Sequence, residues 1–253
     1  MKNSLFSLLM LAASACAPAL SLAAPTITFG VNSDYAMPLV KIAYANERPA
    51  LDEGILKDLG EALSKEMSVQ PKWFLVPKNR VAPSLSTGKV DILCHLNEVW
   101  QPKIVDDVWW SSPLYKSSNV LVFLKQRNVS SVKDIQGETV GTVLNFIYTS
   151  LDSQFKDGSL NREDGPNNVA NIQKLLKGRL QYIVMSNLEY AYYKNIYSSM
   201  NSAELDMDVV MTKCAVSKKS NLKIEDVNKA VAAIHRNGKL NSILRSYYIK
   251  NAM

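Results

Sequence analysis

Polar side chains that could bind a small molecule stand on both sides of an apolar stretch, residues 90–94, that is typical of a buried strand. His95 and Asn97 follow the stretch, and Asn79 and Arg80 precede it at the predicted start of a helix with Asn79 as its N-cap. Ligands bind at the carboxyl ends of strands in open α/β sheets. Arg80 could bind a carboxylate there through two hydrogen bonds. A surface ion pair between Arg80 and a local acid is the alternative.

The sequence offers little for catalysis or metal binding. Of its two histidines, His235 lies near the end of a predicted helix, where a cation is favourable, and His95 has no cysteine or carboxylate nearby at metal-ligand spacing. Neither a nucleophile elbow nor a phosphate-binding Walker loop occurs. Asp106 and Asp107 are adjacent, so on a strand they would point to opposite faces and make a poor acid/base pair. We therefore expect a protein that is not an enzyme and that holds no metal and no cofactor.

A unit of helix, glycine, strand and asparagine occurs twice along the chain. It ends the first time with Gly88 and Asn97 and the second time with Gly178 and Asn187. The repeat suggests two similar α/β lobes, each offering a strand end to a shared cleft. The residues predicted to bind a ligand there are Asn32, Tyr35, Asn79, Arg80, His95, Asn97, Trp100, Asn145, Tyr148, Ser186 and Asn187.

The order of these motifs resembles the family 3 extracellular solute-binding proteins. The resemblance rests on three segments: Leu-x-x-Gly-Lys-Val-Asp from Leu85, the strand and loop after it, and Ser-x-Pro-x-Tyr from Ser111. Residues 132–141 and the tail 227–248 agree with the same family. The resemblance covers nearly all of the predicted mature chain. It implies a type II periplasmic binding protein of the kind that serves polar amino acid ABC transporters.

The resemblance implies a two-lobed α/β fold in which each lobe is a sheet flanked by helices. Two crossing strands would join the lobes and form a hinge. The first lobe is expected to comprise residues 24–121 and 210–253, and the second lobe residues 122–209.

Two details of the expected fold stay open in the sequence. In the family, the loop after the first strand places an aromatic residue over the ligand, which here would be Tyr35; packing of Tyr35 on its own lobe is the alternative. The family fold also lays the strand of Cys214 beside that of Cys94. A disulfide could then form if the Cα atoms approach within about 7 Å, and two separate buried thiols are the alternative.

The sequence departs from the amino-acid binders of this family at two charged positions. Those proteins usually carry an arginine in the loop that here runs from Trp100 to Ile104, and an aspartate in the second lobe where this chain has Asn187. Both charged groups that hold an α-amino acid are therefore expected to be missing. Arg80, aided by Lys78, would favour a small carboxylate, a polar cyclic solute or a modified amino acid over a basic one.

The first 23 residues read as a secretory signal peptide. Lys2 precedes an apolar run from Leu5 to Leu22, and cleavage is predicted after Ala23. A lipoprotein anchored through Cys16 is the alternative. The net charge of +6 is mild for 253 residues, and no run of basic residues exceeds two, so a nucleic-acid partner is not expected.

These features predict a monomeric periplasmic protein that captures a small polar solute, either amino-acid-like or a small carboxylate. Its expected partner is an inner-membrane ABC permease, or a sensor to which it reports. A sensory or regulatory binding domain is the first alternative. The second is an enzyme resembling cyclohexadienyl dehydratases on the same fold.

Overall fold

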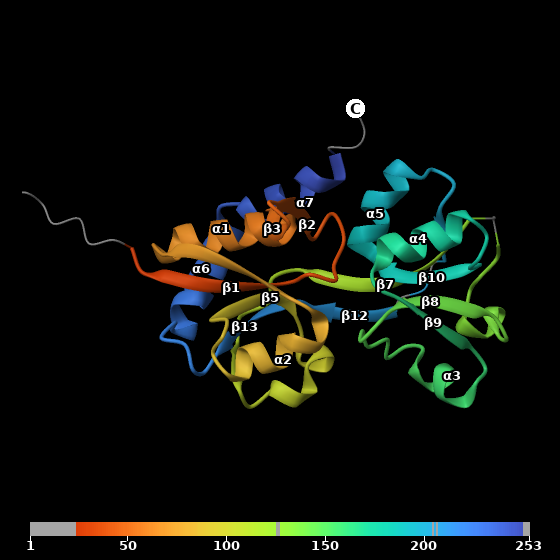
Figure 1. Ribbon diagram of the computed structural model, residues 1–253, viewed down its shortest axis with the longest axis horizontal. Coiled ribbons are helices and arrows are strands. Elements are labelled where there is room, and N and C mark those ends of the chain that lie inside the picture. The colour runs from red at the N-terminus through yellow and green to blue at the C-terminus, as the bar shows by residue number, and fades with distance from the viewer. Residues whose placement is uncertain (1–23, 125–126, 204, 206, 250–253) are drawn as a thin grey trace, which may run out of the picture.

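The computed structural model describes residues 24–249 except 125–126, 204 and 206. The predicted signal peptide, including Cys16, lies outside the described residues. Figure 1 shows two α/β lobes side by side, with β7 and β12 running between them. Each lobe is built around one main sheet with helices on both faces. No helix among the described residues is both long enough and apolar enough to cross a membrane.

The sheet of the first lobe has the strand order β4-β1-β5-β13-β6. Its strands are β1 (Thr26–Asn32), β4 (Gln70–Val76), β5 (Ile92–Leu96), β6 (Val108–Trp110) and β13 (Lys213–Ser217). β1 is parallel to β4 and β5, and β13 returns antiparallel to β5 and β6. One face packs on the apolar stripes of helices α1 (Ile55–Met67), α6 (Ile224–Arg236) and α7 (Lys239–Ile249). The other face is covered by α2 (Lys78–Ser86), whose buried side chains include Val81 and Leu85.

The sheet of the second lobe has the order β11-β7-β10-β8-β9, with β12 also paired to β7. Its strands are β7 (Lys116–Phe123), β8 (Thr139–Val143), β9 (Asn161–Gly165), β10 (Tyr182–Ser186), β11 (Asn201–Ser202) and β12 (Met207–Met211). Helices α4 (Asn168–Leu176) and α5 (Asn187–Ile196) cover one face, and α3 (Asp152–Asp157) lies on the other. Smaller elements are the hairpin β2 (Lys41–Ala45) and β3 (Arg48–Glu53) and the 3-10 turns η1 (Glu98–Trp100), η2 (Pro102–Ile104) and η3 (Val132–Ile135).

The chain crosses between the sheets at residues 111–115 and again at Thr212. β7 pairs with second-lobe strands from Lys116 onward, where Met211 is its partner. Residues 116–121, which the sequence assigns to the first lobe, therefore lie in the second sheet. The crossing was predicted at 122 because β7 is one continuous strand, and nothing in its sequence marks where the chain leaves the first lobe.

Helix α2 begins two residues earlier than predicted, at Lys78 rather than Arg80. Pro77, not Asn79, is the N-cap, and Arg80 N donates to Pro77 O at 2.8 Å. The Lys78 N–H is satisfied from outside the helix by Asp34 Oδ2 at 3.0 Å. The C-terminal stop at Gly88 is as predicted, since Gly88 has the left-handed φ of 74° that suits a glycine after a helix.

Candidate functional site

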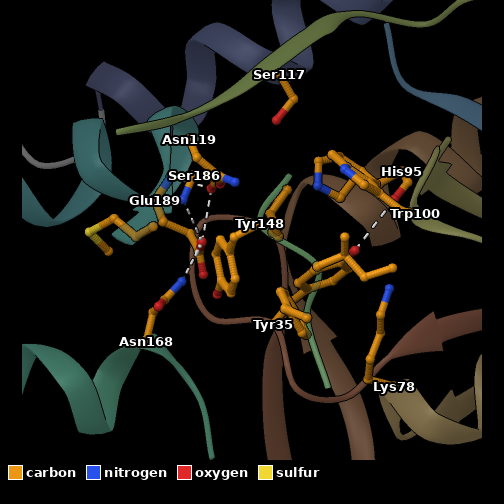
Figure 2. A pocket seen from close by; sticks show the side chains of 14 residues that line it. Tyr35, Lys78, His95, Trp100, Ser117, Asn119, Tyr148, Asn168, Ser186 and Glu189 are labelled. Carbon is orange, nitrogen blue, oxygen red and sulfur yellow. Dashed lines mark hydrogen bonds between the residues drawn. The ribbon is translucent and has the colours of Figure 1, made fainter. Parts of the chain in front are cut away.

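A small cavity of about 40 Å³ lies between the lobes. Side chains of both lobes line it, as Figure 2 shows. The first lobe contributes Tyr35, Leu39, Lys78, His95 and Trp100. The second lobe contributes Ser117, Asn119, Phe146, Ile147, Tyr148, Asn168, Met185, Ser186 and Glu189.

Aromatic rings form one wall of this cavity. Tyr35 meets His95 edge-on, with 5.2 Å between ring centroids, and meets Phe146 of the other lobe edge-on at 5.6 Å. The ring of Trp100 lies 5.8 Å from that of His95. Such rings supply apolar surface, and their faces attract cations. The wall can therefore hold either an apolar body or an ammonium group.

Lys78 brings a positive charge into the cavity from the start of α2. The residue is 9% exposed, and its Nζ lies 5.3 Å from the centroid of the Phe146 ring. Burial lowers the pKa of Lys78 to about 8, and Asp34 partly opposes this shift. Among the described residues, no carboxylate forms an ion pair with this ammonium. A carboxylate of a bound ligand could take that place.

Glu189 brings an acid into the cavity from the first turn of α5. The residue is 3% exposed; its Oε2 accepts from Asn168 Nδ2 and from Ser186 Oγ, both at 2.8 Å. Oε1 accepts from Ala36 N of the first lobe at 3.4 Å. Burial raises the pKa of Glu189, and the hydrogen bonds from Ser186, Asn168 and Ala36 oppose the shift. A cation entering the cavity would favour the ionised carboxylate.

The position of Glu189 follows from a capping box that the sequence contains. Ser186 is the N-cap of α5, and its hydroxyl accepts from Glu189 N while the Glu189 carboxylate accepts from Ser186 N. This reciprocal pair fixes the carboxylate at the helix N-terminus, where the dipole favours a negative charge. The pattern Ser-x-x-Glu was the signal that could have found this acid. Lys78, which was expected to aid Arg80, thus supplies the positive charge of the cavity, and Glu189 supplies an acid that was not predicted.

His95 contributes a neutral ring. It is 2% exposed, and burial, with the nearby charge of Lys78, lowers its pKa to about 3. Its Nδ1 lies 2.9 Å from the Tyr115 hydroxyl. Burial also raises the pKa of Tyr35 and of Tyr148, so both phenols stay protonated at neutral pH. These groups can hydrogen-bond a ligand but carry no charge to it.

The structure brings five of the predicted ligand-binding residues to the cavity and places three others in the framework around it. Those in the cavity are Tyr35, His95, Trp100, Tyr148 and Ser186. Asn32 is fully buried, and its Oδ1 accepts from Asp34 N at 3.0 Å. Asn97 donates to Met211 O at 3.0 Å, and Asn187 accepts from Ser118 N at 3.2 Å. Asn97 follows β5 and Asn187 follows β10, so these bonds tie the ends of both strands to the segments that cross between the lobes.

Arg80, Asn79 and Asn145 lie away from the cavity. Arg80 is exposed and lines a separate hollow with Phe74 and Lys89. It stands two residues after Lys78, about 200° around the helix, so the two side chains point in different directions. Asn145 has φ 65° and caps no helix, since α3 begins at Asp152. Asn79 and Asn145 instead line a groove outside the cavity.

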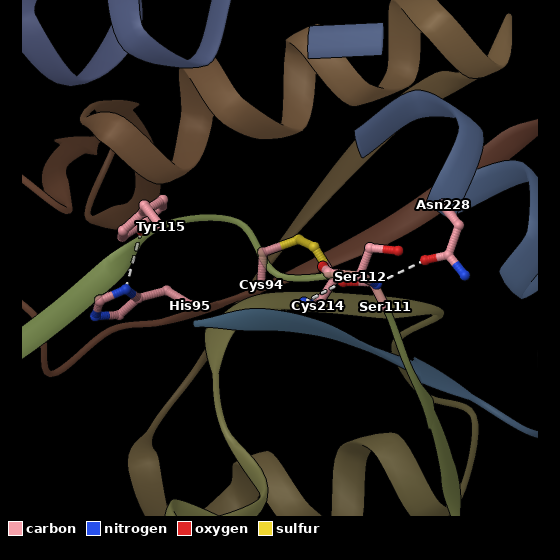
Figure 3. Close-up of a disulfide and its surroundings, with 7 residues drawn as sticks. All are labelled: Cys94, His95, Ser111, Ser112, Tyr115, Cys214 and Asn228. Atoms are coloured by element: carbon pink, nitrogen blue, oxygen red, sulfur yellow. Dashed lines mark hydrogen bonds between the residues drawn. A yellow bond between two sulfur atoms is a disulfide. The ribbon is translucent and has the colours of Figure 1, made fainter. Parts of the chain in front are cut away.

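A disulfide joins Cys94 and Cys214 beside the cavity (Figure 3). The two residues are direct partners in the antiparallel pair β5–β13, with 3.8 Å between their Cα atoms. It ties β5 just before His95 to β13 just after the crossing at Thr212. In the part of the chain that the structure describes, no group of three or more histidine, cysteine, aspartate or glutamate side chains could hold a metal ion.

A sequence model of the bacterial extracellular solute-binding proteins, family 3, matches residues 28–250. No curated protein sequence matches the chain. This match confirms the family that the order of motifs indicated.

Solved structures with the same fold include several binding proteins at low sequence identity. A Streptococcus pneumoniae amino acid ABC transporter substrate-binding protein bound to L-arginine is 18% identical, with a TM-score of 0.72 over 89% of this chain and 95% of that one. A Salmonella typhimurium periplasmic binding protein with high arginine specificity is 18% identical, with a TM-score of 0.71 over 89% and 100%. An ancestral amino acid-binding protein, a precursor of cyclohexadienyl dehydratase, is 20% identical, with a TM-score of 0.69 over 88% and 95%. These likenesses confirm the two-lobed α/β fold.

Proposed function

We propose that this chain, which belongs to the bacterial extracellular solute-binding proteins of family 3, captures a small aminocarboxylate between its lobes for an ABC importer. The observation that carries the proposal is the pair of charged residues in one buried cavity, Lys78 from the first lobe and Glu189 from the second. The ligand carboxylate would pair with Lys78, and its ammonium with Glu189. Charge-assisted hydrogen bonds of this kind are about twice as strong as neutral ones.

The aromatic wall and the solved relatives support the same class of ligand. A ligand ammonium near Glu189 would also lie beside the rings of Tyr35 and Tyr148, whose faces attract cations. The relatives from Streptococcus pneumoniae and Salmonella typhimurium bind arginine. At 18% identity they support an amino-acid-like ligand here without naming which one.

An enzyme on this fold is the second candidate, and Glu189 is the observation that favours it. A buried acid whose pKa is raised can act as a general acid, and Lys78, whose pKa is lowered, lies in the same cavity. No such pair was evident in the sequence. Three protein groups already hydrogen-bond the Glu189 carboxylate, which suits a fixed binding group better than one that passes its proton to a substrate. Incubation with cyclohexadienyl substrates of a dehydratase, followed by ultraviolet absorbance, tests this candidate, and turnover would establish it.

A ligand screen by thermal shift tests the binding function. The panel holds the common amino acids, small organic acids without an amine and amines without a carboxylate. A ligand that binds only the folded state at a hundred times its Kd stabilises it by about 2.7 kcal/mol. We expect stabilisation by compounds that carry both groups. Stabilisation only by compounds that lack one of the two groups would overturn the proposal.

A further inference from the structure

Strand β12, which runs between the lobes, contains an irregularity at Asp208. Met207 and Val210 are three residues apart on β12, but their partners on β7, Asn119 and Ser117, are only two residues apart. Strand β12 therefore carries one extra residue here, which is a β-bulge. Asp208 stands in this bulge with a left-handed φ of 49°. Bulges redirect side chains and are frequent next to functional sites.

The Asp208 carboxylate holds two parts of the cavity wall. Its Oδ1 accepts from Thr149 Oγ1 at 2.5 Å, from Ser150 N at 2.7 Å and from Ser150 Oγ at 2.9 Å. These two residues directly follow Tyr148, whose ring lines the cavity. The other oxygen, Oδ2, accepts from Asn119 Nδ2 at 2.8 Å, and Asn119 also lines the cavity.

The bond to Asp208 decides which end of the Asn119 amide is left for a ligand. A carboxylate only accepts hydrogen bonds, so it takes the NH₂ group of the amide and leaves the oxygen Oδ1 on the other branch. Among the residues that the structure describes, none donates a hydrogen bond to this Oδ1. Because Asn119 lines the cavity, its oxygen can accept a hydrogen bond from a ligand there.

Asn119 lies next to Glu189 on the same wall of the cavity (Figure 2). It is the cross-strand partner of Ser186 in the antiparallel pair β7–β10. Such partners have Cβ atoms about 4.5–5.5 Å apart. Ser186 Oγ in turn donates to Glu189 Oε2 at 2.8 Å. An ammonium group at Glu189 therefore comes within reach of the Asn119 oxygen.

Resting on the proposed function, we propose that Asn119 is the second acceptor for the ligand amine and that Asp208 is the positioning residue that presents it. A primary ammonium has enough N–H groups to donate to Glu189 and Asn119 at once. A tertiary ammonium has the same charge but a single N–H, so one of the two acceptors is left without a bond. The site therefore selects primary aminocarboxylates over their N,N-dialkylated forms.

Calorimetry with alanine and N,N-dimethylalanine tests this inference, because the two compounds carry the same charges. In the parent protein alanine should bind at least about tenfold more tightly, the scale of one hydrogen bond to a charged group. Asp208→Asn should remove most of this preference. The new amide keeps an oxygen for Thr149 and Ser150 but turns its NH₂ group to Asn119, whose oxygen must then face away from the ligand. Any steric cost of the methyl groups is the same in both proteins.

A swapped pair and a matched control separate positioning of Asn119 from support of the fold. Asn119→Asp/Asp208→Asn exchanges donor and acceptor, so position 119 again presents an oxygen to the ligand and the preference for alanine should return. Thr149→Val removes another hydrogen bond of the same carboxylate but leaves Asn119 bound, so this variant should keep the preference. A merely structural Asp208 would instead change the affinities for both compounds alike.

The outcomes separate this inference from the function on which it rests. Equal or tighter binding of N,N-dimethylalanine by the parent, or an unchanged preference in Asp208→Asn, would overturn the inference and leave capture of aminocarboxylates in place. If alanine does not bind, the same comparison is made with the common amino acid that binds best and its N,N-dimethyl form. No binding of any common amino acid would overturn both the inference and the proposed function.

Discussion

Lys78 and Glu189 illustrate how burial prepares single residues for a ligand. Burial removes water from both side chains and so favours their neutral forms. The pKa of Lys78 therefore falls, and the pKa of Glu189 rises. A bound ligand of opposite charge reverses both shifts, because it restores a partner to each group. Binding and protonation are therefore linked at this site.

The linkage predicts how affinity changes with pH. The pKa of Lys78 in the empty cavity is about 8, so its ammonium is lost as pH rises through that value. Affinity for an aminocarboxylate should then fall above about pH 8, by at most about tenfold per pH unit for one proton. At low pH the affinity should fall as Glu189 takes up a proton.

Calorimetry from pH 5 to pH 9 measures this profile, with Lys78→Met as the control. The variant should bind more weakly at neutral pH and should show no additional loss between about pH 7 and pH 9. The same alkaline loss in Lys78→Met would show that another group is responsible.

Residue-level prediction failed where the phase of a helix mattered. The sequence analysis identifies α2 and its end at Gly88, but it takes Asn79 as the cap and Arg80 as the ligand residue. The cap is Pro77, so the first residue of the helix, Lys78, faces the cavity and Arg80 faces away. A shift of two residues turns a helix by more than half a circle. Side-chain direction therefore cannot be read from a sequence whose helix start is uncertain by that amount.

At the scale of elements, the repeated unit was well predicted. Gly88 and Gly178 have nearly the same left-handed φ, 74° and 70°, and each ends a helix before a buried strand. Residues 144–151 form a loop, and α3 begins only at Asp152. The Tyr148 hydroxyl accepts from Val143 N at 2.9 Å, and this bond ties the loop to the end of β8. Such a tertiary contact leaves no periodic signal in the sequence.

The disulfide should stabilise the strand pair that carries His95. It closes a loop with a sequence separation of 120 residues, and replacing it by two alanines should lower the free energy of unfolding by about 2–4 kcal/mol. Denaturant unfolding of Cys94→Ala/Cys214→Ala, compared with the parent, measures the loss. In the denatured mature protein without reductant, thiol counting should find no free thiol. Two reactive thiols would contradict the bridge.

At the scale of the whole molecule, the lobes meet partly through residues that also line the cavity. Ala36 N donates to Glu189, and the ring of Tyr35 contacts Phe146, so residues of the cavity also hold the lobes together. The first crossing is fastened to the first lobe, since Ser112 N donates to Asn228 Oδ1 at 2.7 Å and Cys214 N donates to Ser111 Oγ at 2.9 Å (Figure 3). Movement should therefore concentrate between these fastened residues and β7.

Ligand binding should bring the lobes together. Small-angle scattering with and without the aminocarboxylate that stabilises the protein most should show a smaller radius of gyration at saturation. Glu189→Gln, which removes the charge that faces the ligand, should need more ligand to reach the same change. Unchanged dimensions at full saturation would contradict closure of the lobes.

The pairing of Glu189 with the ligand amine is the central claim, and a cycle of two changes tests it most directly. Calorimetry would compare an aminocarboxylate with its amine-free analogue, each against the parent protein and Glu189→Gln. In the parent, loss of the amine should cost about 1.5–3 kcal/mol, the scale of a hydrogen bond to a charged group. In Glu189→Gln the same loss should cost little, because the partner has gone. An equal cost of removing the amine in both proteins would contradict the pairing.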